Sequence, residues 1–250
     1  MARSTRPLAR KVALVIGGSR GMGAAIARRL AADGARVAIT YLSNGRAARA
    51  VVRDCEKASR MAMAVKADAG DVKTTRAAIQ KVVKKMGRLD ILVYSPVSLG
   101  RAALGDMTEP VFNRAVNVNI KGLYFAVQEA ANHMAKGGRI ITIGSVFSEF
   151  APFPGLDIYT MSKAAMVGLV KAWARDLAPR NISVNCIQPG PIHTDMADPD
   201  SEFGKRLAGM TVFNRLGNVE EIAGLASYLA GPDGGFMTGA AVNCDGGMTN

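Results

Sequence analysis

Residues 12–23 read Val-Ala-Leu-Val-Ile-Gly-Gly-Ser-Arg-Gly-Met-Gly, an apolar run followed at once by a glycine-rich loop. Successive apolar residues are typical of a strand that is covered on both faces of a parallel sheet. Residues 24–33 continue with apolar positions at helical spacing, so the loop lies between a strand and a helix. Such a loop lets backbone N–H groups approach a phosphate at the positive end of the helix. The stretch therefore predicts a dinucleotide site at the end of the first strand.

Short apolar runs alternate with longer amphipathic stretches along the rest of the chain. Strands are predicted at 12–16, 36–40, 62–66, 90–94, 139–143, 182–187 and 240–243. Helices are predicted at about 21–33, 46–59, 72–87, 109–135, 158–178 and 219–230. This alternation predicts an α/β fold, a doubly wound (Rossmann) parallel sheet of about seven strands with helices on both faces. We expect a single domain over 11–250, preceded by a basic N-terminal tail at 1–10.

Composition excludes several other classes of protein. The 250 residues are 49% hydrophobic and 21% charged, which is typical of globular chains and excludes disorder. No apolar run approaches the 18 residues of a membrane span, and no apolar region before Val12 resembles a secretory signal. The three cysteines, Cys55, Cys186 and Cys244, lack metal-ligand spacing, so we expect reduced thiols, no metal site and a cytoplasmic location.

The net charge of +12 is concentrated in the first part of the chain. Residues 1–90 carry 20 Lys and Arg against 6 Asp and Glu, and much of this excess lies on the predicted helices 46–59 and 72–87. These cations avoid the apolar stripes, which is typical of solvated helix faces; attraction to an acidic ligand or protein is the alternative. No basic stretch has interleaved aromatic residues, so nucleic-acid binding is not expected.

The end of the second strand indicates which dinucleotide binds. Proteins that choose NAD usually place a carboxylate there, which accepts a hydrogen bond from the ribose 2′-hydroxyl. Here the segment 39–44 reads Ile-Thr-Tyr-Leu-Ser-Asn, without a carboxylate. Arg20 in the glycine loop can bind a 2′-phosphate with a forked donor, and Ser43, Asn44 and Arg46 can add further donors. NADP(H) is therefore the predicted cofactor.

A tyrosine and a lysine one helical turn apart are the candidate reacting groups. Tyr159 and Lys163 open the predicted helix 158–178 and share one of its faces. A free tyrosine has a pKa of about 10, and a nearby lysine cation favours the phenolate. Ser145, at the end of the fifth strand, can orient a substrate oxygen, and Asn119 can link Lys163 to water. Taken alone, the pair fits an exposed helix face equally well.

Together these motifs resemble the short-chain dehydrogenase/reductase family, and most closely its 3-oxoacyl-carrier-protein reductases, from Lys11 to about Gly247. The matching motifs are the glycines of 17–23, Asp68, Asn119 within 118–122, Ser145, Tyr159 with Lys163, Pro189-Gly190 with Thr194, and the closing 238–247. The resemblance implies that Tyr159 is the general acid/base, that Lys163 lowers its pKa and holds the nicotinamide ribose, that Ser145 positions the carbonyl, and that Asn119 supports a relay water.

The resemblance also implies a cofactor site and a quaternary structure. The implied cofactor-binding residues are Gly17, Ser19, Arg20, Gly21, Met22, Gly23, Tyr41, Leu42, Ser43, Asp68, Ala69, Ser95, Tyr159, Lys163, Pro189, Gly190, Ile192 and Thr194. In this set Asp68 would contact adenine, and Ile192 and Thr194 would hold the carboxamide. Relatives with this closing segment are usually homotetramers with 222 symmetry.

One segment departs from the family pattern. Tyr94-Ser95-Pro96-Val97 stands where the family usually has Asn-Asn-Ala-Gly. Pro96 removes a backbone N–H, and Val97 cannot adopt glycine conformations. We therefore expect altered cofactor contacts beside the fourth strand.

Apolar residues near the predicted site indicate the substrate class. They lie on the loop after Ser145 and on a predicted lid at about 195–213: Phe147, Phe150, Phe153, Leu156, Met196, Phe203, Leu207, Met210 and Phe213. They predict an apolar pocket under a mobile lid, and packing of the two loops alone is the alternative. Together with the resemblance, such a pocket implies an NADPH-dependent reductase that converts a small-molecule ketone, 3-oxoacyl or another apolar or cyclic ketone, into a secondary alcohol.

Other functions remain open at this point. Lys136 and Arg180 stand at positions where 3-oxoacyl reductases meet an acidic acyl carrier protein, so a carrier-bound substrate is one possibility. The alternative from another class is a non-catalytic NADP-binding regulator or scaffold on the same fold. Enoyl reduction is disfavoured, because enoyl reductases usually separate the tyrosine and the lysine more widely.

Overall fold

Seven parallel strands form one sheet in the computed structural model, which describes residues 6–59 and 61–250. The strands are β1 (Val12–Ile16), β2 (Arg36–Tyr41), β3 (Ala62–Lys66), β4 (Leu89–Tyr94), β5 (Met134–Ile143), β6 (Ser183–Pro189) and β7 (Ala241–Cys244). Their order is β3-β2-β1-β4-β5-β6-β7, so the chain reverses its direction across the sheet between β1 and β4. The predicted fold class is confirmed, and ligands of such sheets bind beyond the carboxyl ends at that reversal.

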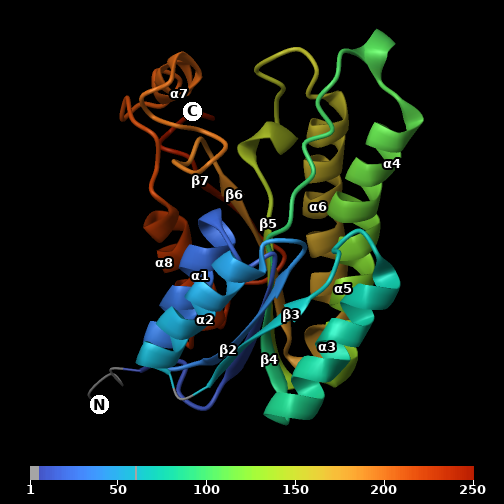
Figure 1. Ribbon diagram of the computed structural model, residues 1–250, viewed down its shortest axis with the longest axis vertical. Helices are drawn as coiled ribbons and strands as arrows, with labels where there is room; N and C mark the ends of the chain where they lie inside the picture. Colours follow the sequence, from blue (N-terminus) through green and yellow to red (C-terminus); the bar gives the residue numbers. More distant parts are fainter. Residues whose placement is uncertain (1–5, 60) are drawn as a thin grey trace.

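Helices cover both faces of the sheet (Figure 1). One face packs against α1 (Gly21–Ala32), α2 (Gly45–Ala58) and α8 (Val219–Ala230), and the other against α3 (Val72–Met86), α5 (Leu123–His133) and α6 (Asp157–Asp176). The burial of strand β1 on both of its faces explains why its sequence is apolar throughout. Ala13 and Val15 belong to the first hydrophobic cluster, whereas the alternate residues Val12, Leu14 and Ile16 belong to the second.

The predicted helix 109–135 consists of three segments. Helix α4 (Glu109–Val116) leads into a π-helical turn, Asn117–Gly122, and α5 follows directly. The turn packs closely on the loop after β3, since a Cβ at Gly122 would lie 1.9 Å from the carbonyl oxygen of Ala69. Such turns occur frequently at functional sites.

Strand β5 begins five residues earlier than the apolar pattern predicts. It pairs with β4 from Met134 onward, with a shift of register between Leu89 and Ile91. Gly137 lies within the early part of the strand at a φ of 88°. This left-handed residue interrupts the apolar run, which explains why the sequence predicts a strand only from 139.

The described part of the predicted N-terminal tail packs against the domain. Leu8 is 1% exposed and joins the cluster under α1, and its N–H donates to the carbonyl oxygen of Asp33 at 2.9 Å. Residues 1–5 of the predicted tail lie outside the described residues. Among the helices that the structure describes, none is long and apolar enough to cross a membrane.

Candidate functional site

The glycine loop borders a groove of about 210 Å³ that runs along the carboxyl ends of β1, β2 and β4. Most of the predicted cofactor-binding residues line it: Gly17, Ser19, Arg20, Gly21, Met22, Gly23, Tyr41, Leu42, Asp68, Ala69, Ser95 and Thr194. Ser43 is exposed outside the groove. The carboxyl edge of the sheet thus brings together segments that lie far apart in the sequence.

Backbone geometry makes the start of α1 suitable for a phosphate. Gly17 has a φ of 77°, and a Cβ there would lie 2.9 Å from the backbone nitrogen of Pro96. Arg20, the N-cap, gives no side-chain cap, and the first turn of α1 carries no acidic residue. Since the first N–H groups of a helix have no intrahelical acceptor, they remain available to an anion. The loop therefore fits the pyrophosphate of a dinucleotide.

The end of β2 also fits a 2′-phosphate. Tyr41 and Leu42 line the groove there, as does the exposed Arg20, and β2 ends without a carboxylate. The side-chain oxygen of Asn44 accepts from the N–H of Ala47 at 2.9 Å and so caps α2. Arg49, which the sequence analysis missed, lies with Tyr41 against Gly45.

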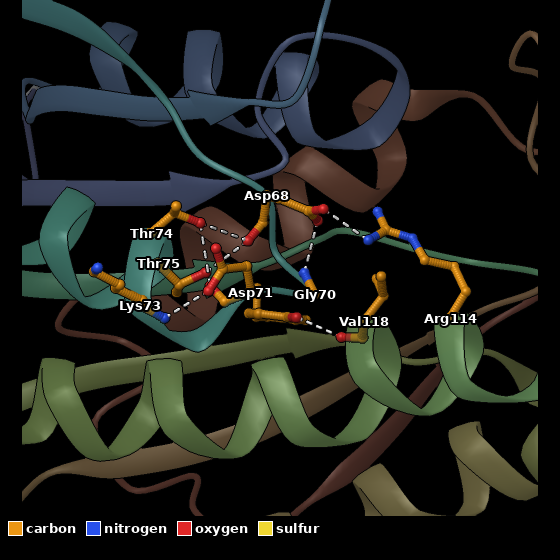
Figure 2. Close-up of polar contacts among 9 residues, drawn as sticks. Asp68, Gly70, Asp71, Lys73, Thr74, Thr75, Arg114 and Val118 are labelled. Carbon is orange, nitrogen blue, oxygen red and sulfur yellow. Dashed lines mark hydrogen bonds and ion pairs between the residues drawn. The ribbon is translucent and has the colours of Figure 1, made fainter. Parts of the chain in front are cut away.

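Asp68 is held by the protein on both carboxylate oxygens (Figure 2). Oδ2 is 2.7 Å from Nη1 of Arg114, and Oδ1 accepts from the N–H of Gly70 at 2.8 Å. The hydrogen bond from Arg114 is the main reason that the pKa of Asp68 lies below its ordinary value. The carboxylate that the groove presents therefore carries its own counter-ion.

The segment that departs from the family pattern lies directly on the groove. Ser95, Pro96 and Val97 line it, and the N–H of Ser95 donates to the carbonyl oxygen of Ile16 at 3.0 Å. Tyr94 is fully buried, and its hydroxyl donates to the carbonyl oxygen of Val118 at 2.5 Å. The tyrosine thus joins the end of β4 to the π-helical turn.

Tyr159, Lys163 and Ser145 meet beside this groove. Nζ of Lys163 lies 5.5 Å from the ring centroid of Tyr159 and donates to the carbonyl oxygen of Ile143 at 2.8 Å. Lys163 is 2% exposed, and burial lowers its pKa to about 8. Burial raises the pKa of the Tyr159 phenol, while its hydrogen bond with Ser145 acts in the opposite direction. The site thus holds a protonated phenol beside a buried amine.

Asn119 lies behind these residues and contacts other partners. It is fully buried in the π-helical turn, where Oδ1 accepts from the N–H of Ser98 at 2.9 Å and Nδ2 donates to the carbonyl oxygen of Ser98 at 2.7 Å. Nδ2 also lies 3.0 Å from Oγ of Ser162 on α6. The Asn119 side chain therefore ties the segment after β4 to the helix that carries Lys163. Asn119 and Pro189 line neither the groove nor the cavity next to it.

An apolar cavity of about 440 Å³ opens in front of Ser145, Tyr159 and Lys163. Of the predicted pocket residues, Phe147, Phe153, Leu156, Met196, Phe203 and Leu207 line it, whereas Phe150, Met210 and Phe213 do not. Gly190, Ile192 and Thr194 border it as well. The rings of Phe153 and Phe203 are 5.8 Å apart, and those of Phe147 and Tyr159 are 6.4 Å apart. Aromatic side chains therefore form part of the apolar wall around the reacting groups.

The predicted lid contains a short helix that the sequence analysis missed. Helix α7 (Glu202–Ala208) lies within 195–213, and Ser201 caps it by accepting from the N–H of Gly204 at 3.0 Å. Leu207, Ala197 and Leu216 form a small hydrophobic cluster that packs against Phe147 and Phe153. The lid thus lies against the loop that follows Ser145.

Comparisons with known proteins agree with this geometry. The family model described as Enoyl-(Acyl carrier protein) reductase matches residues 16–249. The chain is 40% identical to the cyclic-di-GMP-binding biofilm dispersal mediator protein of Escherichia coli, over 94% of this chain and 96% of that protein. A short-chain dehydrogenase of Burkholderia cenocepacia, crystallised in complex with NADP, superposes with a TM-score of 0.96 and 40% identity, over 98% of this chain and 100% of that one. The chain belongs to the short-chain dehydrogenase/reductase family.

A further relative in the short-chain dehydrogenase/reductase family is named as a reductase. Elsinochrome reductase 1 of Elsinoe fawcettii is 36% identical, over 98% of this chain and 97% of that protein. The predicted family resemblance is confirmed.

The structure corrects the prediction about Lys136 and Arg180. Both lie near the start of β5, whereas Ser145 follows its carboxyl end, about 25–30 Å away along a strand of this length. Arg180 donates to the carbonyl oxygens of Ala131 and Met134. Within one chain, then, these two cations do not border the cavity. Lys136 lies in the early part of β5, and Arg180, on the turn Ala178–Arg180 before β6, is bonded beside the first residue of β5, so both lie at the opposite end of the sheet.

Sequence reasoning missed several residues that hold the site of this short-chain dehydrogenase/reductase together. Thr40 accepts from the N–H of Gly17 at 3.1 Å, Arg114 pairs with Asp68, and Gln188 contacts Ser145. Arg101 lies at the cavity as its one charged neighbour besides Lys163 among the described residues. Their contacts join segments that are distant in the sequence, so no spacing rule indicates them. The one signal in the sequence is that Thr40 and Gln188 are polar residues at the ends of apolar strands.

Proposed function

We propose that this chain is an NADPH-dependent reductase that transfers a hydride to a ketone, giving a secondary alcohol, with Tyr159 as the proton donor. The observation that carries the proposal is the meeting of Tyr159, Ser145 and Lys163 at the wall of an apolar cavity that adjoins the glycine-loop groove. NADP(H) is the cofactor, and it supplies the hydride; this chain supplies the binding groove, the orientation and the proton.

Each reacting residue has a role that its surroundings support. The raised pKa of Tyr159 keeps the phenol protonated, as a proton donor to the ketone oxygen requires. Ser145 hydrogen-bonds that phenol and can orient the same ketone oxygen. The Lys163 ammonium, held by the carbonyl oxygen of Ile143, stabilises the phenolate that remains after the proton has left. Asn119 supports this arrangement through α6.

The cavity walls favour a flat aromatic or cyclic ketone as the substrate. Phe147, Phe153 and Phe203 line the cavity, and aromatic rings pack well against planar ring systems. The relative named elsinochrome reductase supports the same substrate class. A 3-oxoacyl chain on an acyl carrier protein is the second substrate candidate, supported by the description of the matching family model.

A panel of ketones with NADPH tests the proposal. Purified protein should oxidise NADPH when mixed with aromatic or cyclic ketones, and more slowly with linear 3-oxoacyl thioesters. Absorbance at the reduced-nicotinamide band measures the rate, and product analysis identifies the alcohol. No turnover with any ketone of the panel would contradict the proposal.

The second candidate function is a non-catalytic NADP-binding regulator. The Escherichia coli relative, whose name describes cyclic-di-GMP binding and biofilm dispersal, favours it. A binding module has no need of Tyr159, Ser145 and Lys163 together, which favours the enzyme. NADPH binding without ketone turnover, together with binding of a cyclic dinucleotide, would support the regulator.

Arg20 should determine the preference for NADPH over NADH. We expect Arg20→Ala to raise KM for NADPH about 10- to 100-fold and to leave KM for NADH nearly unchanged, because a charge-assisted hydrogen bond contributes about 1.5–3 kcal/mol. Tyr41→Asp should shift the preference toward NADH by repelling the 2′-phosphate. Steady-state kinetics with both cofactors measures this, with the exposed Arg53→Ala as the matched control. A wild-type enzyme that prefers NADH, with Arg20→Ala indifferent to both, would reject the assignment.

We further propose a cytoplasmic homotetramer. Exposed apolar side chains support the assembly, among them Phe236 in the segment after α8. The cysteines Cys55, Cys186 and Cys244 are free thiols, which supports a reducing compartment.

A further inference from the structure

Gln188 is a fully buried amide at the carboxyl end of β6, next to the reacting groups. Burial of a polar side chain is costly unless its hydrogen bonds are made inside the protein. Gln188 lines neither the groove nor the cavity, so contact with a ligand does not account for the burial of this side chain.

Both ends of the Gln188 amide bond the turn that begins at Ser145. Oε1 accepts from the N–H of Ser145 at 3.1 Å, and Nε2 lies 2.5 Å from Oγ of Ser148, to which it donates. The last pair of the β5–β6 ladder is Ile143 with Ile187, so the N–H of Ser145 lies just beyond the ladder. A primary amide offers an acceptor and two donors at once, which lets one side chain serve both positions.

These contacts fix the short 3₁₀ turn Val146–Ser148 at its beginning and at its end. Within the turn, the N–H of Ser148 donates to the carbonyl oxygen of Ser145 at 2.9 Å, and the N–H of Phe147 donates to Oγ of Ser145 at 3.2 Å. The turn carries Phe147 into the cavity wall. A Cβ at Gly144 would lie 2.3 Å from Oε1 of Gln188, so glycine leaves the space through which the amide reaches Ser145.

We infer that Gln188 is a positioning residue for the ketone reduction: it holds the backbone of Ser145 and the turn after it, so that the Ser145 hydroxyl stays aimed at the Tyr159 phenol and the ketone oxygen. This inference rests on the proposed function. Small displacements of an orienting group reduce rate strongly, so the hydrogen bonds of Gln188 act on the chemical step and not on cofactor binding.

The test replaces Gln188 by methionine, which keeps the volume and removes both polar atoms. Gln188→Met should lower kcat roughly 10- to 50-fold and leave the Kd for NADPH within about 2-fold of wild type. The matched control is Gln128→Met, at an exposed glutamine on α5. NADPH fluorescence measures Kd, and turnover of the ketone that the wild type reduces measures kcat.

A double-mutant cycle with Ser145→Ala separates positioning from a general structural effect. If Gln188 acts through Ser145, Gln188→Met should reduce kcat by less than about 2-fold in the Ser145→Ala background. Ser148→Ala, which removes one of the two contacts without removing buried volume in the sheet, should lower kcat about 3-fold by the same route; if Gln188→Met does not fold, this variant takes its place in the cycle.

The outcomes distinguish this inference from the proposed function. A wild type that turns over no ketone overturns both. An active wild type with full kcat in Gln188→Met, or with the full loss repeated in the Ser145→Ala background, overturns the inference and leaves the proposed function standing. A loss of NADPH affinity that matches the loss of rate also overturns it, because it indicates a disturbed fold.

Discussion

Replacing Tyr159 by phenylalanine is expected to lower kcat for ketone reduction by at least ~10²-fold, the low end for general acid–base catalysis. The substitution removes only the phenolic oxygen, and the ring keeps its packing beside Phe147. Burial keeps the phenol protonated, so the hydroxyl is available as the proton donor at neutral pH. Without it, the developing alkoxide loses the proton donor that the proposed reaction assigns to it.

Two measurements decide this prediction. NADPH oxidation with a reducible ketone gives kcat, and fluorescence titration gives the Kd for NADPH, which should stay near the wild-type value. Tyr228→Phe on α8, at a half-exposed phenol, is the matched control and should leave both unchanged. Turnover retained in Tyr159→Phe would remove Tyr159 from the mechanism.

Replacing Lys163 by methionine is expected to lower kcat/KM for NADPH by more than ~10²-fold, through both rate and affinity. The ammonium is buried and lies near the Tyr159 ring, so one cation can serve the phenolate and the cofactor. Lys171→Met, two turns further along α6 and exposed, is the matched control. A Lys163→Met variant with normal NADPH affinity would contradict the double role.

The same lysine should set the alkaline limit of the wild-type enzyme. Burial lowers the pKa of Lys163 to about 8, so the ammonium is present below that pH and is lost as the pH rises through it. Because kcat/KM for NADPH reports groups of the free enzyme, it should fall above about pH 8. Lys163→Arg keeps its charge and should lose this limb, provided that it retains activity. A wild-type profile that is flat to pH 10 would contradict the assignment.

The sequence predicts the sheet well because burial on both faces has a direct signature. The residues of β1 alternate between two hydrophobic clusters, so every position is apolar and the strand can be recognised from its composition alone. The π-helical turn and α7 have no such signature. The first depends on the close approach of Gly122 to Ala69, and the second is a short helix on a loop, where capping by Ser201 is the main local signal.

In the candidate site, too, the local motifs could be predicted from the sequence and the long-range contacts could not. The glycine loop and the Tyr159–Lys163 pair are local motifs, and their spacing follows from one loop and one helical turn. Gln188 and Arg114 act on residues more than 40 positions away in the chain. The pairing of β5 with β6 brings Gln188 to Ser145, and the packing of α4 beside the loop after β3 brings Arg114 to Asp68. The burial of Leu8 within a basic segment is likewise a tertiary property that charge alone conceals.

Ala197 and Leu207 of the lid form a small hydrophobic cluster with Leu216, apart from the two clusters that cover the sheet. Local opening of a segment costs free energy in proportion to the apolar contacts that it gives up. Detaching the lid gives up this cluster, its contacts with Phe147 and Phe153, and the hydrogen bond from the N–H of Val212 to the carbonyl oxygen of Gly246, and it leaves the two clusters that cover the sheet intact. Exchange of ligand with solvent can thus proceed through a partial opening, at a small fraction of the free energy of global unfolding.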